Sequence, residues 1–243
     1  MKHCSISDIG LVREKNQDAY LYLENESGDV LALVLDGIGG ARAGEVASSE
    51  TVAYLEQHFS ALKAYRDLKD AKEKLYHLLN QANDHVYRLS RRYRDYEGMG
   101  TTLSGLFFTK YGILSVNIGD SRVYGLLDNK LFHLTEDDTL INEMLKSGEI
   151  SYQESLNHPK RHYLTKAIGV YLNVDPDIHP IKAMERFLIC SDGMYGYCQD
   201  EELLNILNDK HLSLDECLES LKNLALMKGG YDNITGIIID LNE

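Results

Sequence analysis

Four short β-rich segments between Thr101 and Leu134 constrain the fold of this chain more than any other feature. They cover residues 102–109, 113–118, 123–127 and 131–134, and glycine or Asp-Asn turn residues separate them. Short segments of this kind, bounded by turn residues, are typical of antiparallel strands. We therefore expect an antiparallel meander in this region.

Helical patterns lie before and after these strands. Apolar residues repeat with helical spacing in residues 43–59 and 68–89, and shorter helices are predicted at residues 138–145, 152–156, 201–207 and 214–227. Further strands are predicted at residues 30–35, 187–190 and 234–240. Because strands and helices are grouped in separate runs, an α+β fold is favoured over a parallel sheet. Residues 1–243 contain no repeat or linker, so we expect one domain.

The net charge of −13 limits the partners that this chain can have. Nucleic-acid binding is not expected, because the basic residues are outnumbered and dispersed. The same acidity would repel a phosphorylated substrate, so any phosphate chemistry must rely on metal ions or selected arginines for local positive charge.

The N-terminal sequence and the cysteines indicate a cytoplasmic protein. The first eight residues lack the apolar stretch of a signal peptide, and no later apolar run approaches the length of a membrane span. The four cysteines show no CxxC pair, so we expect buried free thiols. Membrane association is not expected.

Three aspartates stand where an apolar strand meets a turn. Asp36 and Asp192 each precede a glycine after a predicted strand, and Asp232 precedes Asn233 before the last strand. Taken singly, such pairs are common turn residues, whose carboxylates bond nearby backbone groups. Collected at one edge of a β core, they would form a hard-oxygen site for Mg²⁺ or Mn²⁺.

Order and context make these motifs more specific. The segments, in chain order, are Arg13-Glu14-Lys15-Asn16-Gln17-Asp18, Asp36-Gly37-Ile38-Gly39-Gly40, Gly100-Thr101-Thr102, Gly119-Asp120-Ser121-Arg122, Leu164-Thr165-Lys166-Ala167-Ile168-Gly169, Ser191-Asp192-Gly193 and Asp232-Asn233. Together they resemble the bacterial branch of the metal-dependent protein serine/threonine phosphatases, the PPM or type 2C family. The resemblance implies a four-layer αββα sandwich, in which two antiparallel sheets pack face to face between helices.

The resemblance also implies a set of metal ligands. Asp36 would bridge two Mn²⁺ or Mg²⁺ ions, Asp192 and Asp232 would complete one of them, and the carbonyl of Gly37 would bind the other. Asp18 would accept a hydrogen bond from metal-bound water and orient it. A turn or helix cap is the alternative for Asp18.

Two further residues and one segment have both a functional and a structural interpretation. Arg13 resembles the phosphate clamp, and a surface cation paired with Glu14 is the alternative. Asp120 resembles a ligand of a third metal ion shared with Asp192, although a local ion pair with Arg122 would also explain its turn. Residues 137–169 resemble a flap beside the active site, or else form a plain loop packed on the core.

The implied reaction is hydrolysis of phosphoserine and phosphothreonine in proteins by a water or hydroxide that bridges two metal ions. Some relatives outside bacteria carry a histidine where this chain has Ile38, so either a metal-bound water would protonate the leaving oxygen or the alcohol would leave with less assistance. No role is assigned to any of the nine histidines. The expected partners are phosphoproteins that a bacterial serine/threonine kinase modifies, and the chain is expected to be a monomer. Alternatives are a regulatory scaffold with little turnover and a hydrolase of small phosphorylated metabolites.

Overall fold

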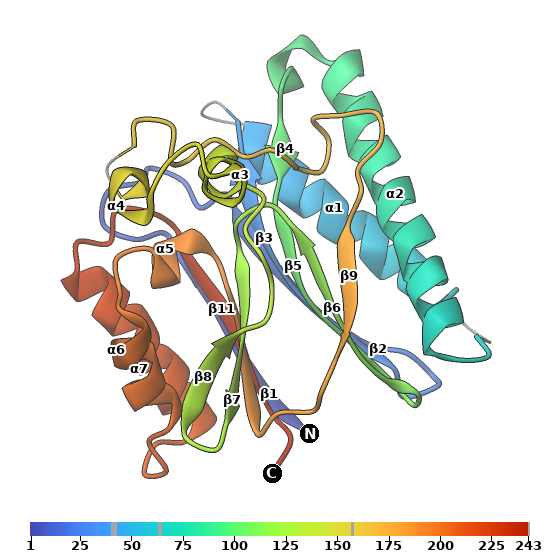
Figure 1. The fold of residues 1–243 in the computed structure, drawn as a ribbon. Helices are drawn as coiled ribbons and strands as arrows, with labels where there is room; N and C mark the ends of the chain where they lie inside the picture. The colour runs from blue at the N-terminus through green and yellow to red at the C-terminus, as the bar shows by residue number, and fades with distance from the viewer. Residues whose placement is uncertain (40–42, 63–64, 157, 243) are drawn as a thin grey trace.

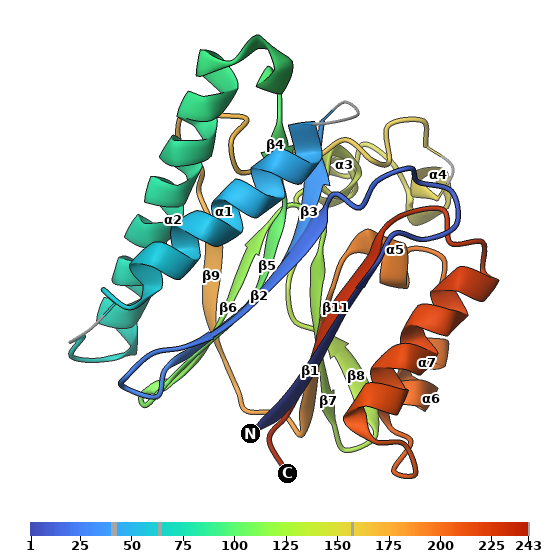
Figure 2. The ribbon, with the colours of Figure 1, turned by 180° about the vertical axis from the view of Figure 1, so that it is seen from behind.

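The strands form two antiparallel sheets in a computed structural model, which describes residues 1–39, 43–62, 65–156 and 158–242 (Figures 1 and 2). The first sheet has the order β1 (Lys2–Asp8), β11 (Ile234–Asp240), β10 (Arg186–Cys190), β7 (Arg122–Leu127) and β8 (Lys130–His133). The second sheet has the order β2 (Asp18–Glu24), β3 (Val30–Ile38), β5 (Leu103–Thr109), β6 (Gly112–Ile118) and β9 (Asp177–Ile181). The short strand β4 (Gly100–Thr101) pairs with the end of β3.

Helices cover the outer faces of the two sheets (Figure 1). The second sheet is covered by α1 (Ala43–Phe59) and α2 (Leu68–Arg92), and the first by α6 (Asp200–Leu207) and α7 (Leu214–Met227). A 3-10 turn, η1 (Arg94–Tyr96), follows α2. This αββα arrangement confirms the predicted fold class. Within the described ranges, no helix combines the length and the apolar character needed to cross a bilayer.

The apolar run in β3 is continuous because this strand is buried on both faces. Val30, Ala32 and Val34 face the core between the sheets, together with residues such as Ile237 and Phe187 of the first sheet. The alternate residues of β3, which are Leu31, Leu33 and Leu35, pack in the core beneath α1 and α2. Successive side chains of a strand point to opposite faces, so a strand between two layers needs apolar residues at every position.

A local sequence motif sets the start of α7. Ser213 caps α7 in a capping box, in which its hydroxyl bonds Glu216 N–H and the Glu216 carboxylate accepts the Ser213 N–H at 2.9 Å. This reciprocal pairing satisfies two free donors at the helix start. The predicted helix at residues 214–227 and strand at residues 234–240 are therefore confirmed with the same bounds.

The predicted meander is wrong in one respect, because its strands belong to different sheets. β5 pairs with β6 in the second sheet, whereas β7 pairs with β8 in the first. Gly119 between them has a φ of +98° and sends the chain across the sandwich instead of into a hairpin. The crossing leaves Asp120 at the seam between the sheets.

The predicted end of the strand at Leu35 is also wrong. β3 continues to Ile38, because Gly37 and Ile38 pair with β4 and the N–H of Thr102 donates to the carbonyl of Asp36 at 2.8 Å. Asp36 therefore lies within a strand, where both neighbours fix its backbone. Residues 40–42 of the glycine-rich motif lie outside the described residues.

Candidate active site

Five aspartates from both sheets reach the same end of the sandwich. Asp18 begins β2 and lies directly opposite Asp36 of β3 in the register of the two strands. Asp120 follows β6, Asp192 begins the short helix α5 (Asp192–Tyr195) after β10, and Asp232 precedes β11. Like charges placed opposite each other on paired strands are destabilising, so this arrangement needs a source of positive charge.

The pKa shifts of these aspartates also indicate that the site needs a source of positive charge. Burial raises the pKa of Asp36 well above its usual value, and the negative charges of Asp18, Asp192, Asp120 and Asp232 raise it further. Burial is also the largest cause of the raised pKa of Asp18, Asp120 and Asp192, and a neighbouring carboxylate adds to each shift. Carboxylates gathered in this way are held ionised by a nearby cation.

The oxygen donors of this site fit hydrated divalent ions. Asp192 Oδ1 is buried and has no hydrogen-bond partner among the described residues. Across the described residues, no three or more acidic, histidine or cysteine side chains are arranged so that they could together hold a metal ion. Mg²⁺ retains several waters and takes only one or two carboxylates, so these aspartates suit ions that are held partly through water.

Gly37 is placed beside these carboxylates by a close contact with helix α1. A Cβ atom added at Gly44 would lie 2.5 Å from the carbonyl oxygen of Gly37. The N–H of Gly37 donates to the carbonyl of Gln17 at 3.1 Å. These contacts hold the backbone on both sides of the Cα of Gly37, the residue whose carbonyl the resemblance implies as a metal ligand.

Arg13 contacts a carboxylate of the site. Its Nη2 donates to Asp232 Oδ2 at 2.6 Å, so the alternative pairing with Glu14 is wrong. The guanidinium beside Asp232 retains exposed N–H groups, since the side chain is about half exposed. A planar guanidinium in this position can bind two phosphate oxygens in a fork.

Asn233 holds the loop that carries Arg13, and sequence reasoning gave it no role. Its Nδ2 donates to the carbonyls of Ile9 and Lys15 at 2.9 Å each, and its Oδ1 accepts the N–H of Gln17 at 2.8 Å. The Asp-Asn pair before the last strand was the available signal. The amide of Asn233 thus fixes the position of residues 9–17 relative to β11.

Ser191 is a second residue that sequence reasoning missed. Its hydroxyl donates to Asp18 Oδ2 at 2.7 Å and accepts the N–H of Thr235 at 3.1 Å. Asp18 is the first residue of β2, so its interpretation as a turn or helix cap is wrong. Ser191 thereby links the carboxylate of one sheet to the backbone of the other.

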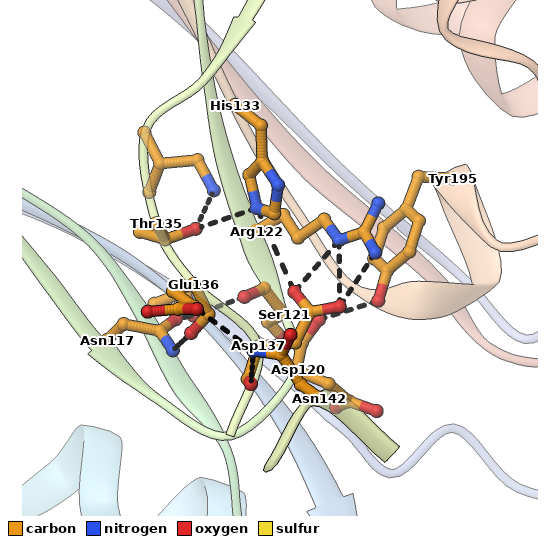
Figure 3. A network of polar contacts seen from close by, with 12 residues as sticks. Asn117, Asp120, Ser121, Arg122, His133, Thr135, Glu136, Asp137, Asn142 and Tyr195 are labelled. Atoms are coloured by element: carbon orange, nitrogen blue, oxygen red, sulfur yellow. Dashed lines mark hydrogen bonds and ion pairs between the residues drawn. The ribbon is translucent and has the colours of Figure 1, made fainter. Parts of the chain in front are cut away.

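The turn at Asp120 is held by a network that Figure 3 shows. Arg122 donates to the two carboxylate oxygens of Asp137 at 2.9 and 2.7 Å, and its guanidinium lies 3.9 Å from the ring centroid of Tyr195. The Tyr195 hydroxyl donates to the carbonyl of Asp120 at 2.7 Å. Arg122 is therefore engaged with Asp137, and the alternative of a local Asp120–Arg122 ion pair is wrong.

The two ends of the flap-like segment, residues 137–169, lie close together next to this turn. It contains α3 (Leu140–Ser147) and α4 (Tyr152–Ser155). The N–H of Asp138 donates to the carbonyl of Gly119 at 2.9 Å, and the N–H of Thr165 donates to the carbonyl of Asp138 at 2.8 Å. Residues 138 and 165 thus form a neck beside Asp120; residue 157 lies outside the described residues.

A cavity of about 750 Å³ lies between this segment and two of the five aspartates. Asp120 and Asp192 form one side of it, and His162 of the segment is also in its lining. The positive charge of His162 lowers the pKa of Asp192, against the larger effect of burial. Sequence reasoning gave no role to His162, because its proximity to Asp192 depends on the folded segment.

Comparison with known proteins agrees with this geometry. The profile of the family described as Protein phosphatase 2C matches residues 12–225. The chain is 34% identical to the serine/threonine phosphatase stp of Listeria welshimeri, over 97% of this chain and 94% of that protein. It is 31% identical to the protein phosphatase PhpP of Streptococcus pneumoniae, over 98% and 96%.

Solved structures show the same architecture. The serine/threonine phosphatase Stp1 of Staphylococcus aureus superposes with a TM-score of 0.90 at 29% identity, over 99% of this chain and 94% of that one. The Mycobacterium tuberculosis phosphatase PstP/Ppp superposes with a TM-score of 0.85 at 32% identity, over 99% and 98%.

The fold and the carboxylate site define a metal-dependent protein phosphatase. The chain belongs to the protein phosphatase 2C family, and the family predicted from the motifs is confirmed.

Proposed function

We propose that this enzyme removes phosphate from phosphoserine and phosphothreonine in proteins with the aspartates described above. The observation that carries the proposal is the convergence of Asp18 and Asp36 from one sheet with Asp192 and Asp232 from the other, beside the guanidinium of Arg13. The relatives from Listeria welshimeri and Staphylococcus aureus, which are named serine/threonine phosphatases and match over nearly the same length, support it.

Asp36, Asp192, Asp232 and the Gly37 carbonyl would hold two ions, Mn²⁺ or Mg²⁺, and Asp120 with Asp192 would hold a third. When bound, these ions would activate a water for attack on phosphorus and neutralise charge on the phosphate. The unpaired oxygen of Asp192 supports its role as a ligand.

The remaining residues act on substrate and water. Arg13 binds the phosphate oxygens, and its bond to Asp232 aligns the guanidinium with the site. Asp18, held by Ser191, accepts a hydrogen bond from the attacking water and orients it. Ile38 offers no proton, so the leaving oxygen takes its proton from water.

The wider context of the enzyme follows from the same reasoning. We propose that residues 1–243 act as one phosphatase domain, a monomer, with residues 137–169 as the flap. Its substrates are targets of a bacterial serine/threonine kinase. The four cysteines are unpaired, which supports a reducing compartment such as the cytoplasm.

A phosphothreonine peptide assayed with and without chelator tests this function. We expect EDTA to abolish hydrolysis and excess Mn²⁺ to restore it, because the proposed ligands are all oxygen atoms. Full activity in EDTA would contradict the metal mechanism. No turnover of the peptide with Mn²⁺ present would favour the regulatory scaffold, and a preference for small phosphorylated metabolites would favour the third alternative.

Replacing Arg13 with alanine is expected to raise KM for phosphopeptides about ten- to a hundredfold, because hydrogen bonds to charged groups contribute about 1.5–3 kcal/mol. The fall in kcat should be smaller, since the guanidinium binds phosphate in both the ground and transition states. Lys15→Ala is the control, because Lys15 lies on the same loop but pairs with Glu45. Steady-state kinetics that show an unchanged KM in Arg13→Ala would remove Arg13 from the phosphate site.

A further inference from the structure

Exposed apolar side chains gather beside the phosphate-binding arginine. Leu11 and Val12, which are 69% and 60% exposed, immediately precede Arg13. The N–H of Leu11 donates to the carbonyl of Gly230 at 2.8 Å, which places this loop against the exposed Tyr231. We name Leu11, Val12, Tyr197 and Tyr231 the apolar shelf.

The apolar shelf reaches the cavity beside Asp120 and Asp192 through Tyr197. The ring of Tyr197 lies 5.0 Å from the ring of Tyr231, centroid to centroid. Tyr197 also lines the cavity that Asp120 and Asp192 border. Figure 1 shows the loop after β1 side by side with the segment before β11, and both lie near α5. A peptide leaving the cavity would therefore meet the shelf.

The shelf is held in a fixed position, unlike scattered apolar residues on a mobile surface. The three hydrogen bonds of Asn233 fix residues 9–17, and the bond of Arg13 to Asp232 adds a further contact. A surface ordered before binding loses less conformational entropy when a partner docks. Contiguous exposed apolar residues are typical of interaction sites.

The charge of the chain also favours an apolar contact. With a net charge of −13, long-range electrostatics oppose the approach of a phosphorylated protein. Arg13 and the proposed metal ions act on the phosphate group itself, so contacts that do not depend on net charge can add affinity for the residues beside it. Burial of apolar surface provides such affinity.

We propose that the apolar shelf binds apolar residues adjacent to the phosphorylated residue of the substrate protein. This inference rests on the proposed function, in which the phosphoryl group lies at Arg13 and the aspartates. It assigns to the enzyme a preference for phosphorylation sites flanked by aliphatic or aromatic side chains.

The test compares two phosphothreonine peptides of equal length and charge, with leucine and valine or with serine and glycine beside the phosphothreonine. In Mn²⁺-loaded enzyme, kcat/KM should be higher for the apolar peptide. The double variant Leu11→Ser/Val12→Ser should lower the apolar-to-polar ratio of kcat/KM roughly tenfold, as expected when about 1.4 kcal/mol of apolar burial is lost. Tyr231→Ser should lower the ratio in the same direction.

Leu172→Ser is the matched control, because Leu172 is 60% exposed on a loop beside α2. It should leave the ratio unchanged. Hydrolysis of p-nitrophenyl phosphate, which has no flanking residues, reports the chemical step separately. If the unaltered enzyme does not hydrolyse p-nitrophenyl phosphate, the proposed function is in doubt. If the apolar-to-polar ratio of kcat/KM is the same in all variants, only the docking inference is overturned. A change of molecular mass in solution upon Leu11→Ser/Val12→Ser would instead identify the shelf as a contact between two copies of the chain.

Discussion

Replacing Asp192 with asparagine is expected to lower kcat for phosphopeptides by about 10³-fold, and Asp36→Asn should act similarly. Each substitution exchanges an anionic metal ligand for a neutral amide of similar shape. A bound divalent ion supplies several kcal/mol of transition-state stabilisation, and each 1.36 kcal/mol corresponds to a factor of ten. Steady-state kinetics and titration of Mn²⁺ by calorimetry measure the two consequences.

The fold should survive both substitutions. In the metal-free protein, each removes a negative charge from a cluster in which burial and neighbouring carboxylates already raise the pKa of Asp36. The melting temperature without metal should therefore remain equal or rise. Asp175→Asn is the control, because Asp175 is exposed and does not line the cavity beside Asp120 and Asp192. Near-normal Mn²⁺ binding by Asp192→Asn would exclude Asp192 as a ligand.

A methyl group added at Gly193 is expected to disrupt the site through the backbone. The added Cβ would lie 1.9 Å from the carbonyl oxygen of Asn233 and 3.2 Å from Cβ of Asp232. The segment before β11 must move, and overpacking of this kind costs about 1–3 kcal/mol. Gly193→Ala should therefore lower the melting temperature by several degrees, at about 2–4 °C per kcal/mol, and also weaken Mn²⁺ binding.

Gly28→Ala separates loss of stability from loss of the site. Gly28 has a φ of +77° and no atom within 4 Å of an added Cβ, so alanine there is strained but meets no neighbour. This strain costs of the order of 1 kcal/mol. Both variants should melt at lower temperature, but only Gly193→Ala should lose metal affinity. Normal Mn²⁺ affinity in Gly193→Ala would show that the Asp232 segment tolerates the displacement.

Local sequence signals predicted most elements of the fold. The helix at residues 214–227 depends on a capping box that spans four residues, and the strand at 234–240 is a nearly continuous apolar run. Sheet membership was not predictable in this way, because β7 pairs with β10 across a long stretch of chain. The positive φ of Gly119, which separates β6 from β7, depends on that tertiary arrangement.

For the candidate site too, residues with a local motif were predicted and residues defined by distant contacts were missed. The strand-end aspartates and Arg13 were identified from turn motifs and family order, and the structure brings their side chains together. Ser191 and Asn233 were missed because their partners lie 173 and 224 positions away. For Asn233 the Asp-Asn pair was the local signal, but it does not show which backbone groups the amide binds. Residues such as these, which hold other site residues by hydrogen bonds, can be recognised only when the fold shows where their partners lie.

The place of β11 in the first sheet has a consequence for synthesis of the enzyme. β11 lies between β1 and β10, so the first strand of the chain has no partner in that sheet until residues 234–240 have been made. The loop bearing Arg13 likewise depends on Asn233 for its position. A nascent chain on the ribosome therefore cannot assemble the aspartates into a working site. We therefore expect dephosphorylation to begin only after translation has passed the last strand.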